Sequence, residues 1–214
     1  ASQEPGHATL GLLVLWRHRS LLKDFVVQDL RRRYTGGALG IFWTIGTPLL
    51  ELITYTFVFH GLIGVQFQEH AGWASYALFL FSGMVAWLAT ADGIAHGSGS
   101  LVNNGHLLKK LNFPALVLPA HVVLSASVNQ FIRLLVLILA TLLLSGAVSW
   151  HVAVLPLVLV LQLGFTLGVT MMLSVAMVYF RDTGHLINAV LLLWMFITPI
   201  FYPAASYPKQ AILL

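Results

Sequence analysis

The chain has 214 residues, of which 58% are hydrophobic and 8% are charged, and its formal net charge is +4 at pH 7. Soluble domains average about 45–50% apolar and about 25% charged residues, so this composition excludes an ordinary soluble fold. The absence of cysteine excludes disulfides and thiolate metal sites. Basic residues concentrate before residue 34, beside long apolar runs, which indicates an all-α protein that crosses a membrane several times.

The first predicted element is an amphipathic helix over residues 12–34. Apolar residues recur there at three- and four-residue spacing, while charged and amide side chains take the opposite face. The apolar positions are Leu21, Leu22, Phe25, Val26 and Leu30, and the polar ones are Lys23, Asp24, Gln28, Asp29 and Arg31. This pattern is typical of a helix that lies in the membrane interface rather than crossing the bilayer.

Five apolar segments follow, and each is predicted to span the membrane. A bilayer core about 30 Å thick takes roughly 20 apolar residues to cross as a helix. The third segment is longer than one straight span, so we expect it to be tilted or to begin in the interface. The predicted spans are 38–59, 73–95, 113–146, 152–180 and 186–201. Because the sequence stops inside the apolar run 211–214, we expect a sixth span to be missing from the C-terminus.

The connections between the spans carry an asymmetric charge. The N-terminal segment has six basic residues, the polar loop 97–112 has two, and the turn 181–184 has one. On the alternate side the only basic residue is Lys209. Loops rich in Lys and Arg stay in the cytoplasm. The N-terminus, the 97–112 loop and the 181–184 turn are therefore predicted to be cytoplasmic.

Three charged residues lie inside apolar segments, namely Glu51, Asp92 and Arg133. Charge at membrane depth is costly, so such residues usually face a cavity, a bundle interior or an oppositely charged partner. For Glu51, two interpretations stay open: a residue lining a substrate route, or an internal ion pair or hydrogen bond that fixes helix packing. For Asp92 and Arg133 we favour a packing role close to an interface.

No catalytic motif appears in the sequence. It has neither a phosphate-binding loop nor an H-E-x-x-H pair, and its nine histidines lack metal-ligand spacing. We therefore predict that this chain is not an enzyme and holds no metal or cofactor, so that any ATPase must be a partner. A membrane-embedded lipid-linked glycosyltransferase would need clustered acids, which only Asp24 and Asp29 approach. A proton-coupled transporter would need more titratable groups at depth than Glu51.

Aromatic residues and small-residue pairs allow more than one interpretation. Aromatics in the first and fifth spans form either interfacial belts and packing contacts or a passage whose rings stack on sugar faces. The pairs Gly93/Gly97 and Gly164/Gly168 have the spacing that lets helices approach closely. They predict tight helix packing and do not identify a site.

Several motifs together resemble ABC-2 type polysaccharide export permeases. Residues 29–43 carry a basic-Tyr element followed by Leu-Gly and a Trp, and Pro48-Leu49 comes next. Further matches occur in family order at 103–104, 107–110, 113–114, 118–119, 181–182, 198–200 and 202–203. The resemblance runs from about residue 20 to residue 210.

This resemblance implies the transmembrane subunit of an ATP-driven exporter in the bacterial inner membrane. Its substrate would be a lipid-linked polysaccharide such as O-antigen, teichoic acid, capsule or another cell-wall glycan. The subunit would act as a homodimer with two cytoplasmic ABC ATPase subunits, which would bind ATP and Mg. The alternative within the same fold is an ABC-2 permease for a drug or a small lipid.

The resemblance also assigns roles to residues. The 12–34 helix matches the family's gate helix, here represented by Asp29, Arg31, Arg32, Arg33 and Tyr34. The 97–112 loop matches the family's coupling helix, which docks on the ATPase, and the polar 181–184 turn is interpreted as a second docking element. The predicted docking residues are Asn103, Asn104, His106, Leu107, Lys109, Lys110, Arg181 and Asp182. Predicted channel-lining residues are Trp43, Glu51, Tyr55, Phe59, Trp194, Phe196, Phe201 and Tyr202. Residues 202–214 match a re-entrant segment on the extracytoplasmic side.

Overall fold

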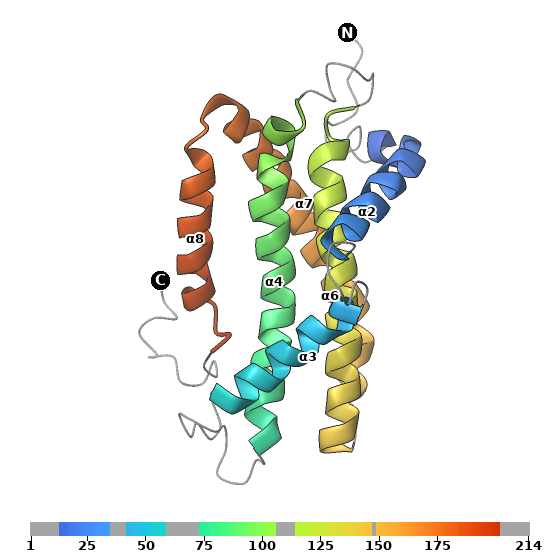
Figure 1. Cartoon of the computed structure of the whole chain (residues 1–214), viewed down its shortest axis with the longest axis vertical. Coiled ribbons are helices and arrows are strands. Elements are labelled where there is room, and N and C mark those ends of the chain that lie inside the picture. Colours follow the sequence, from blue (N-terminus) through green and yellow to red (C-terminus); the bar gives the residue numbers. More distant parts are fainter. Residues whose placement is uncertain (1–12, 35–41, 59–72, 106–113, 147–148, 202–214) are drawn as a thin grey trace.

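A computed structural model describes residues 13–34, 42–58, 73–105, 114–146 and 149–201 of the chain. These described segments are almost entirely helical (Figure 1). In chain order they are α2 (Arg19–Tyr34), α3 (Trp43–Tyr55), α4 (Trp73–Asn103), α6 (Val117–Ser145), the 3-10 helix η3 (Trp150–Val154), α7 (Leu155–Tyr179) and α8 (Thr183–Ile197). The predicted all-α fold class is confirmed.

Three helical segments in the described part of the chain are long and apolar enough to cross a membrane. They are Ser75–Asn103, Val117–Leu144 and Trp150–Tyr179, and a shorter apolar helix covers Thr183–Ile197. α3 has 13 residues, which at about 1.5 Å per residue extend for only about 20 Å of a core about 30 Å thick. α3 and α8 are therefore shorter than a straight span requires.

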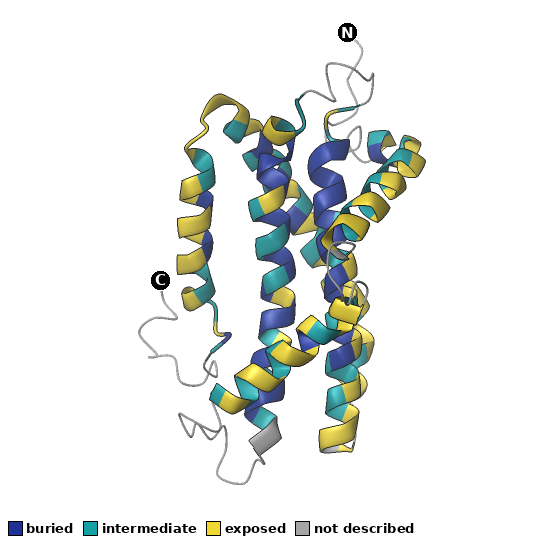
Figure 2. Cartoon of the chain, in the orientation of Figure 1, coloured by how far each residue is buried: buried dark blue, intermediate teal, exposed yellow. Residues whose placement is uncertain are grey.

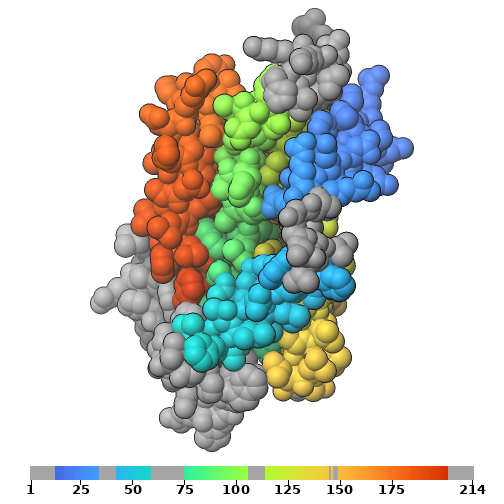
Figure 3. Space-filling view, viewed as in Figure 1, coloured from blue at the N-terminus to red at the C-terminus, as the bar shows by residue number. Residues whose placement is uncertain are grey.

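The three long helices form the centre of the molecule. α4 packs along α6 and α7, as Figure 1 shows, while α8 stands beside α4 on the left of that view. The two short N-terminal helices lie obliquely across this bundle, α2 against α6 and α3 across α6 and α4. In the space-filling view of Figure 3 they cover one face, and a strip of α4 stays visible beside α8.

Close approach between α4 and α7 depends on two glycines of α4. A Cβ at Gly93 would lie 2.9 Å from Thr166 Cγ2, and a Cβ at Gly97 would collide with Thr170 Cγ2. Because these positions have no side chain, Thr170 Oγ1 comes within 3.4 Å of the Gly93 carbonyl and donates a hydrogen bond to it. By contrast, a Cβ at Gly164 or Gly168 would have no neighbour within 4 Å. Of the two predicted glycine pairs, the one in α4 serves helix packing within the described chain.

A polar network adds a second link among the three long helices. Gln130 Nε2 on α6 donates to Gln162 Oε1 on α7 at 2.8 Å. Gln162 Nε2 donates in turn to the Ala86 carbonyl at 2.8 Å and to Thr90 Oγ1 on α4 at 2.9 Å. Lipid gives little hydrophobic drive for helix association, so hydrogen bonds and close packing hold such bundles together.

Apolar packing is concentrated on α4. One cluster joins Tyr76, Leu80 and Trp87 of α4 to Ile187 and Leu191 of α8. Figure 2 shows the result, with buried residues following α4 and the upper part of α6 and exposed residues covering the outer side of α8. Only 6% of the apolar stretch within Trp150–Tyr179, which includes α7, is buried, so most of this helix faces outward.

Helix boundaries differ from the sequence prediction in two places. α4 continues to Asn103, so the first residues of the predicted 97–112 loop belong to the helix. The small polar residues there are buried rather than exposed, with Ser98 at 1% and Ser100 at 3% relative exposure. The predicted first span, 38–59, is represented by the short helix α3 and a π-helical turn at residues 56–58. The helix predicted over residues 12–34 appears as α2, preceded by a helical turn at residues 13–17.

Candidate functional site

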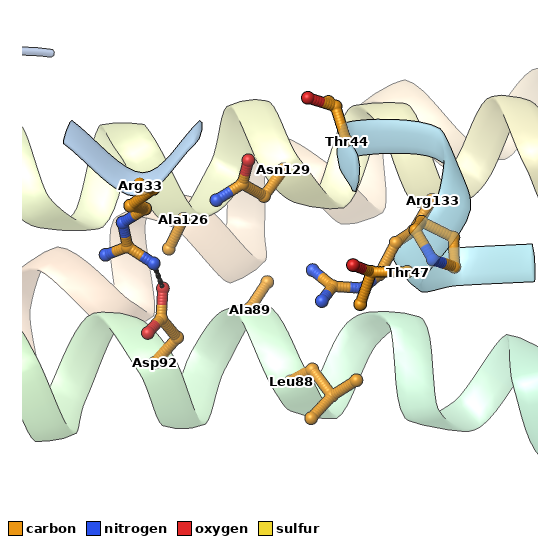
Figure 4. Close-up of a pocket in the computed structure, with 10 residues that line it drawn as sticks. Arg33, Thr44, Thr47, Leu88, Ala89, Asp92, Ala126, Asn129 and Arg133 are labelled. Atoms are coloured by element: carbon orange, nitrogen blue, oxygen red, sulfur yellow. Dashed lines mark hydrogen bonds and ion pairs between the residues drawn. The ribbon is translucent and has the colours of Figure 1, made fainter. Parts of the chain in front are cut away.

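A polar cavity of about 360 Å³ lies where the two short helices cross the long ones (Figure 4). α2 contributes one residue, α3 three, α4 three and α6 three. They are Arg33, Thr44, Thr47, Pro48, Leu88, Ala89, Asp92, Ala126, Asn129 and Arg133. We call this the ion-pair cavity, because two of its lining cations are held by carboxylates.

The first ion pair joins α2 to α4. Arg33 Nη1 donates to Asp92 Oδ2 at 2.8 Å, and Arg33 Nε donates to Asp29 Oδ2 at 3.1 Å. Burial by itself would lower the pKa of Arg33, but the two carboxylates outweigh it and raise that pKa. His96 Nδ1, one turn along α4, lies 2.9 Å from Asp92 Oδ1. Asp92 therefore attaches the C-terminal end of α2 to α4, while Leu22 and Phe25 pack against the start of α6.

The second ion pair joins α3 to α6. Arg133 donates from Nε to Glu51 Oε2 at 3.2 Å and from Nη2 to Glu51 Oε1 at 3.3 Å. This two-bond geometry is the strongest arrangement of a guanidinium and a carboxylate. Both side chains are about one-fifth exposed, at 19% and 21%. Of the two interpretations of Glu51 left open by the sequence, the structure shows the ion pair.

A second cavity of about 590 Å³ lies between α2, α4 and the start of α6. We call it the α2–α4 cavity. It is lined by Asp29 and Arg32 from the predicted gate helix and by Asn103 and Asn104 from the predicted docking element. His96 and Ser100 continue the same face of α4 down to Asp92. The structure thus brings together two groups of residues that the sequence could assign only separately.

Most of the predicted channel-lining aromatics in the described chain lie around one core cluster on α4. Tyr55, Trp194 and Phe201 border the same core cluster on α4. Trp194 packs edge-on against Trp87 at a centroid distance of 5.6 Å. Phe196, although exposed on α8, stacks on Phe201 at a centroid distance of 5.7 Å. Trp43 stands apart from them, exposed at the first residue of α3.

Several predicted site residues are exposed or fall outside the description. Arg31, Arg32, Arg181 and Asp182 are exposed, as is Asn103. Outside the described residues, or with side chains that are not described, are Tyr34, Phe59, His106, Leu107, Lys109, Lys110 and Tyr202. The predicted re-entrant segment 202–214 also lies outside the described residues.

Sequence reasoning missed which charges pair with which, and it missed the Gln130–Gln162 link. The available signal was polarity at depth, since each buried charge needs a partner. That signal cannot match Glu51 with Arg133, which are 82 residues apart in the chain. Among the described residues there is no group of three or more His, Asp or Glu that could hold a metal ion.

The fold and cavities describe a multi-pass membrane protein whose short N-terminal helices are tied to a core of long apolar helices. Over residues 21–213 the sequence matches the family described as ABC-2 type transporter, and the chain belongs to this family. The predicted family is thereby confirmed. Membership implies a membrane subunit that works with ATPase subunits in an ABC transporter.

Curated relatives carry names that specify a substrate. The O-antigen export system permease protein RfbA of Myxococcus xanthus is 31% identical over 197 residues, which are 92% of this chain and 74% of that protein. Two proteins of the same name from Klebsiella pneumoniae are 28% and 29% identical, and each match covers 89% of this chain and 71% of the relative. All three are named as permeases rather than enzymes.

Proposed function

We propose that this chain is the membrane-spanning subunit of an ATP-driven exporter of lipid-linked polysaccharide. The observation that carries the proposal is its similarity, over nine-tenths of its length, to O-antigen export permeases. The exporter would consist of two copies of this chain and two cytoplasmic ABC ATPases that bind ATP and Mg. It would lie in the bacterial inner membrane with its N-terminus in the cytoplasm.

Architecture and charge support this assignment. α2, the end of α4, the start of α6 and the turn between α7 and α8 lie at one end of the molecule, at the top of Figure 1. α2 begins at this end with Arg19 and then slopes toward the middle of the bundle, and Arg181 lies in the α7–α8 turn, so basic residues occur at this end, as expected for the cytoplasmic side. An ATPase docked at this end would contact the residues assigned to coupling.

α4 supplies a path from the docking end to the ion-pair cavity. It is a single helix from the coupling residue Asn103 to Asp92, which holds Arg33 of the gate helix. A push on the 97–112 segment would therefore move Asp92, and with it the end of α2. We propose that ATP binding closes the motor, shifts α2 through this link and opens a route for the glycan.

The test is to reverse the charge of the predicted docking loop. The variant Lys109→Glu with Lys110→Glu should lose glycan-stimulated ATP hydrolysis and export, each by about tenfold or more, because like charges across an interface cost several kcal/mol. The measurement is ATPase activity of the purified complex with its candidate motor, with and without lipid-linked glycan.

Lys209→Glu is the control, because it reverses the basic residue predicted for the opposite side and should leave both activities unchanged. Wild-type stimulation in the double variant would remove the loop from the coupling path. If this chain associates with no ATPase, the exporter assignment itself fails.

A further inference from the structure

An amphipathic groove runs between α2 and α6, apart from both cavities described above. Its volume is about 460 Å³. Leu22 and Val26 of α2 and Leu124, Val128 and Phe131 of α6 form its apolar walls. Arg19 and Lys23 stand at its rim, one helical turn apart on α2. The groove thus combines a long apolar surface with two cations on the same side of one helix.

An exposed tryptophan beside the rim indicates its depth in the membrane. The guanidinium carbon of Arg19 sits 5.4 Å from the centre of the Trp16 ring, and Trp16 is 70% exposed. Tryptophan prefers the boundary between headgroups and acyl chains. Trp16 therefore locates Arg19 at that boundary, and Lys23 can extend its ammonium to the same level.

The rim is also short of negative charge. In the described part of the chain, neither Arg19 nor Lys23 has an acidic partner in an ion pair. The nearby acids Asp29 and Asp92 both pair with Arg33. Asp24, the acid nearest to the rim in sequence, lines a neighbouring groove of α2 together with Lys23 and Arg31, but among the described ion pairs it forms none with Lys23. Two unneutralised cations at headgroup depth favour an anionic group.

Below the groove, α6 continues as an exposed apolar stripe. Phe131, Leu135 and Leu139 recur every four residues and are all more than half exposed. They belong to the apolar span Val117–Leu144. An occupant of the groove can therefore extend along α6 into the bilayer core, as an acyl chain does and a soluble ligand does not.

We propose that the α2–α6 groove binds one anionic phospholipid, with its phosphate between Arg19 and Lys23 and an acyl chain along Val128 and Phe131. The bound lipid fills the space between the oblique helix α2 and the span on which it rests. Anionic lipid would thus stabilise the attachment of α2 to the bundle. This inference concerns a lipid of the surrounding membrane and holds whatever substrate the exporter carries.

The experiment is native mass spectrometry of the intact permease titrated with phosphatidylglycerol or with phosphatidylcholine. We expect one phosphatidylglycerol to be retained in preference to phosphatidylcholine. In Arg19→Gln with Lys23→Gln, affinity for phosphatidylglycerol should fall by about 30-fold, since each cation near an anionic surface accounts for roughly a fivefold effect. Phosphatidylcholine retention should not change in this variant.

Two further variants separate the groove from general charge and from folding. Arg17→Gln with Arg181→Gln removes the same amount of charge from exposed positions outside the groove and should retain phosphatidylglycerol normally. Val128→Trp keeps every charge but fills the apolar wall, and it should also lose the bound lipid. Its circular dichroism and elution volume report whether it is folded.

The proposal is overturned by equal retention of the two lipids, by wild-type retention in the Arg19/Lys23 variant, or by an equal loss in the Arg17/Arg181 control. Preferential retention of a polyprenyl phosphate over phosphatidylglycerol would assign the groove to a carrier lipid and overturn the phospholipid assignment.

Discussion

Charged side chains at depth link each of the two short helices to a long one. α2 is attached to α4 by Arg33 and Asp92, and α3 is attached to α6 by Arg133 and Glu51. Neither short helix has the length of a straight span, so each gains less from burial in the bilayer than the long helices do. An ion pair with directed hydrogen bonds therefore adds to the apolar contacts that each short helix makes with the bundle.

The Glu51–Arg133 ion pair is expected to contribute to the free energy of unfolding. Glu51→Gln leaves the Arg133 guanidinium largely buried without its counter-charge, which should lower the free energy of unfolding by up to about 3 kcal/mol. Thermal unfolding of the detergent-solubilised permease measures the effect.

The companion variant combines Glu51→Gln with Arg133→Gln. Because it removes both charges, it should recover most of the loss seen in the single variant. Equal instability of the two variants would show that the pair is not the reason why Glu51 matters, and would return Glu51 to a role in the substrate route.

At this scale the sequence predicted that Glu51, Asp92 and Arg133 face a cavity, a bundle interior or an oppositely charged partner, because charge in apolar segments is costly. It could not predict their partners, since pairing depends on how helices cross. The packing role favoured for Asp92 and Arg133 agrees with the ion pairs that the structure shows.

At the scale of elements, the close contact between α4 and α7 depends on glycine. The two α4 glycines lie under Thr166 and Thr170, whereas the glycines of α7 face open space. Both pairs have the same four-residue spacing in the sequence, so spacing alone could not tell which pair packs inside the chain. Which pair packs inside the chain depends on whether another helix lies opposite the glycines.

A matched pair of substitutions tests this difference. Gly97→Ala should lower the free energy of unfolding by about 1–3 kcal/mol, because its Cβ would overlap Thr170. Gly164→Ala should leave stability unchanged or raise it slightly, because its Cβ meets nothing and alanine favours the helix.

Thermal unfolding of both variants, compared with wild type, gives the answer. Similar behaviour of the two would contradict the close α4–α7 packing. A loss confined to Gly164→Ala would instead indicate that the outward face of α7 is buried in the assembled transporter.

At the scale of the whole molecule, the arrangement of helices agrees with the charge asymmetry. α2 and the α7–α8 turn, which carry basic residues, lie at one end, and the η3 turn between α6 and α7 lies at the other (Figure 1). Because loops rich in Lys and Arg stay in the cytoplasm, the end with the basic residues is predicted to be cytoplasmic.

The cysteine-free sequence makes this orientation directly measurable. Ser149→Cys near η3 should react with a membrane-impermeant maleimide in intact spheroplasts, because Ser149 is exposed at the predicted extracytoplasmic end. Arg181→Cys should react only after permeabilisation. The reverse pattern would place the N-terminus outside and would exclude docking of a cytoplasmic ATPase at the proposed end.

The sequence by itself determined the class of this protein. Apolar segments of bilayer length, an amphipathic N-terminal helix and one-sided basic loops follow from residue type and spacing, which are local properties. The ABC-2 motifs follow from residue identity and order in the same way. Element type is therefore readable along the chain, although the end of α4 is not, because buried serines and glycines there look like a loop.

Only the tertiary structure decided how the elements meet. It matched Arg33 with Asp92 and Glu51 with Arg133, and it placed predicted gate and docking residues around the α2–α4 cavity. It also joined the α2 cations to the lipid-facing stripe of α6. These relations connect residues far apart in the chain and depend on helix crossing geometry, which hydrophobic periodicity does not encode.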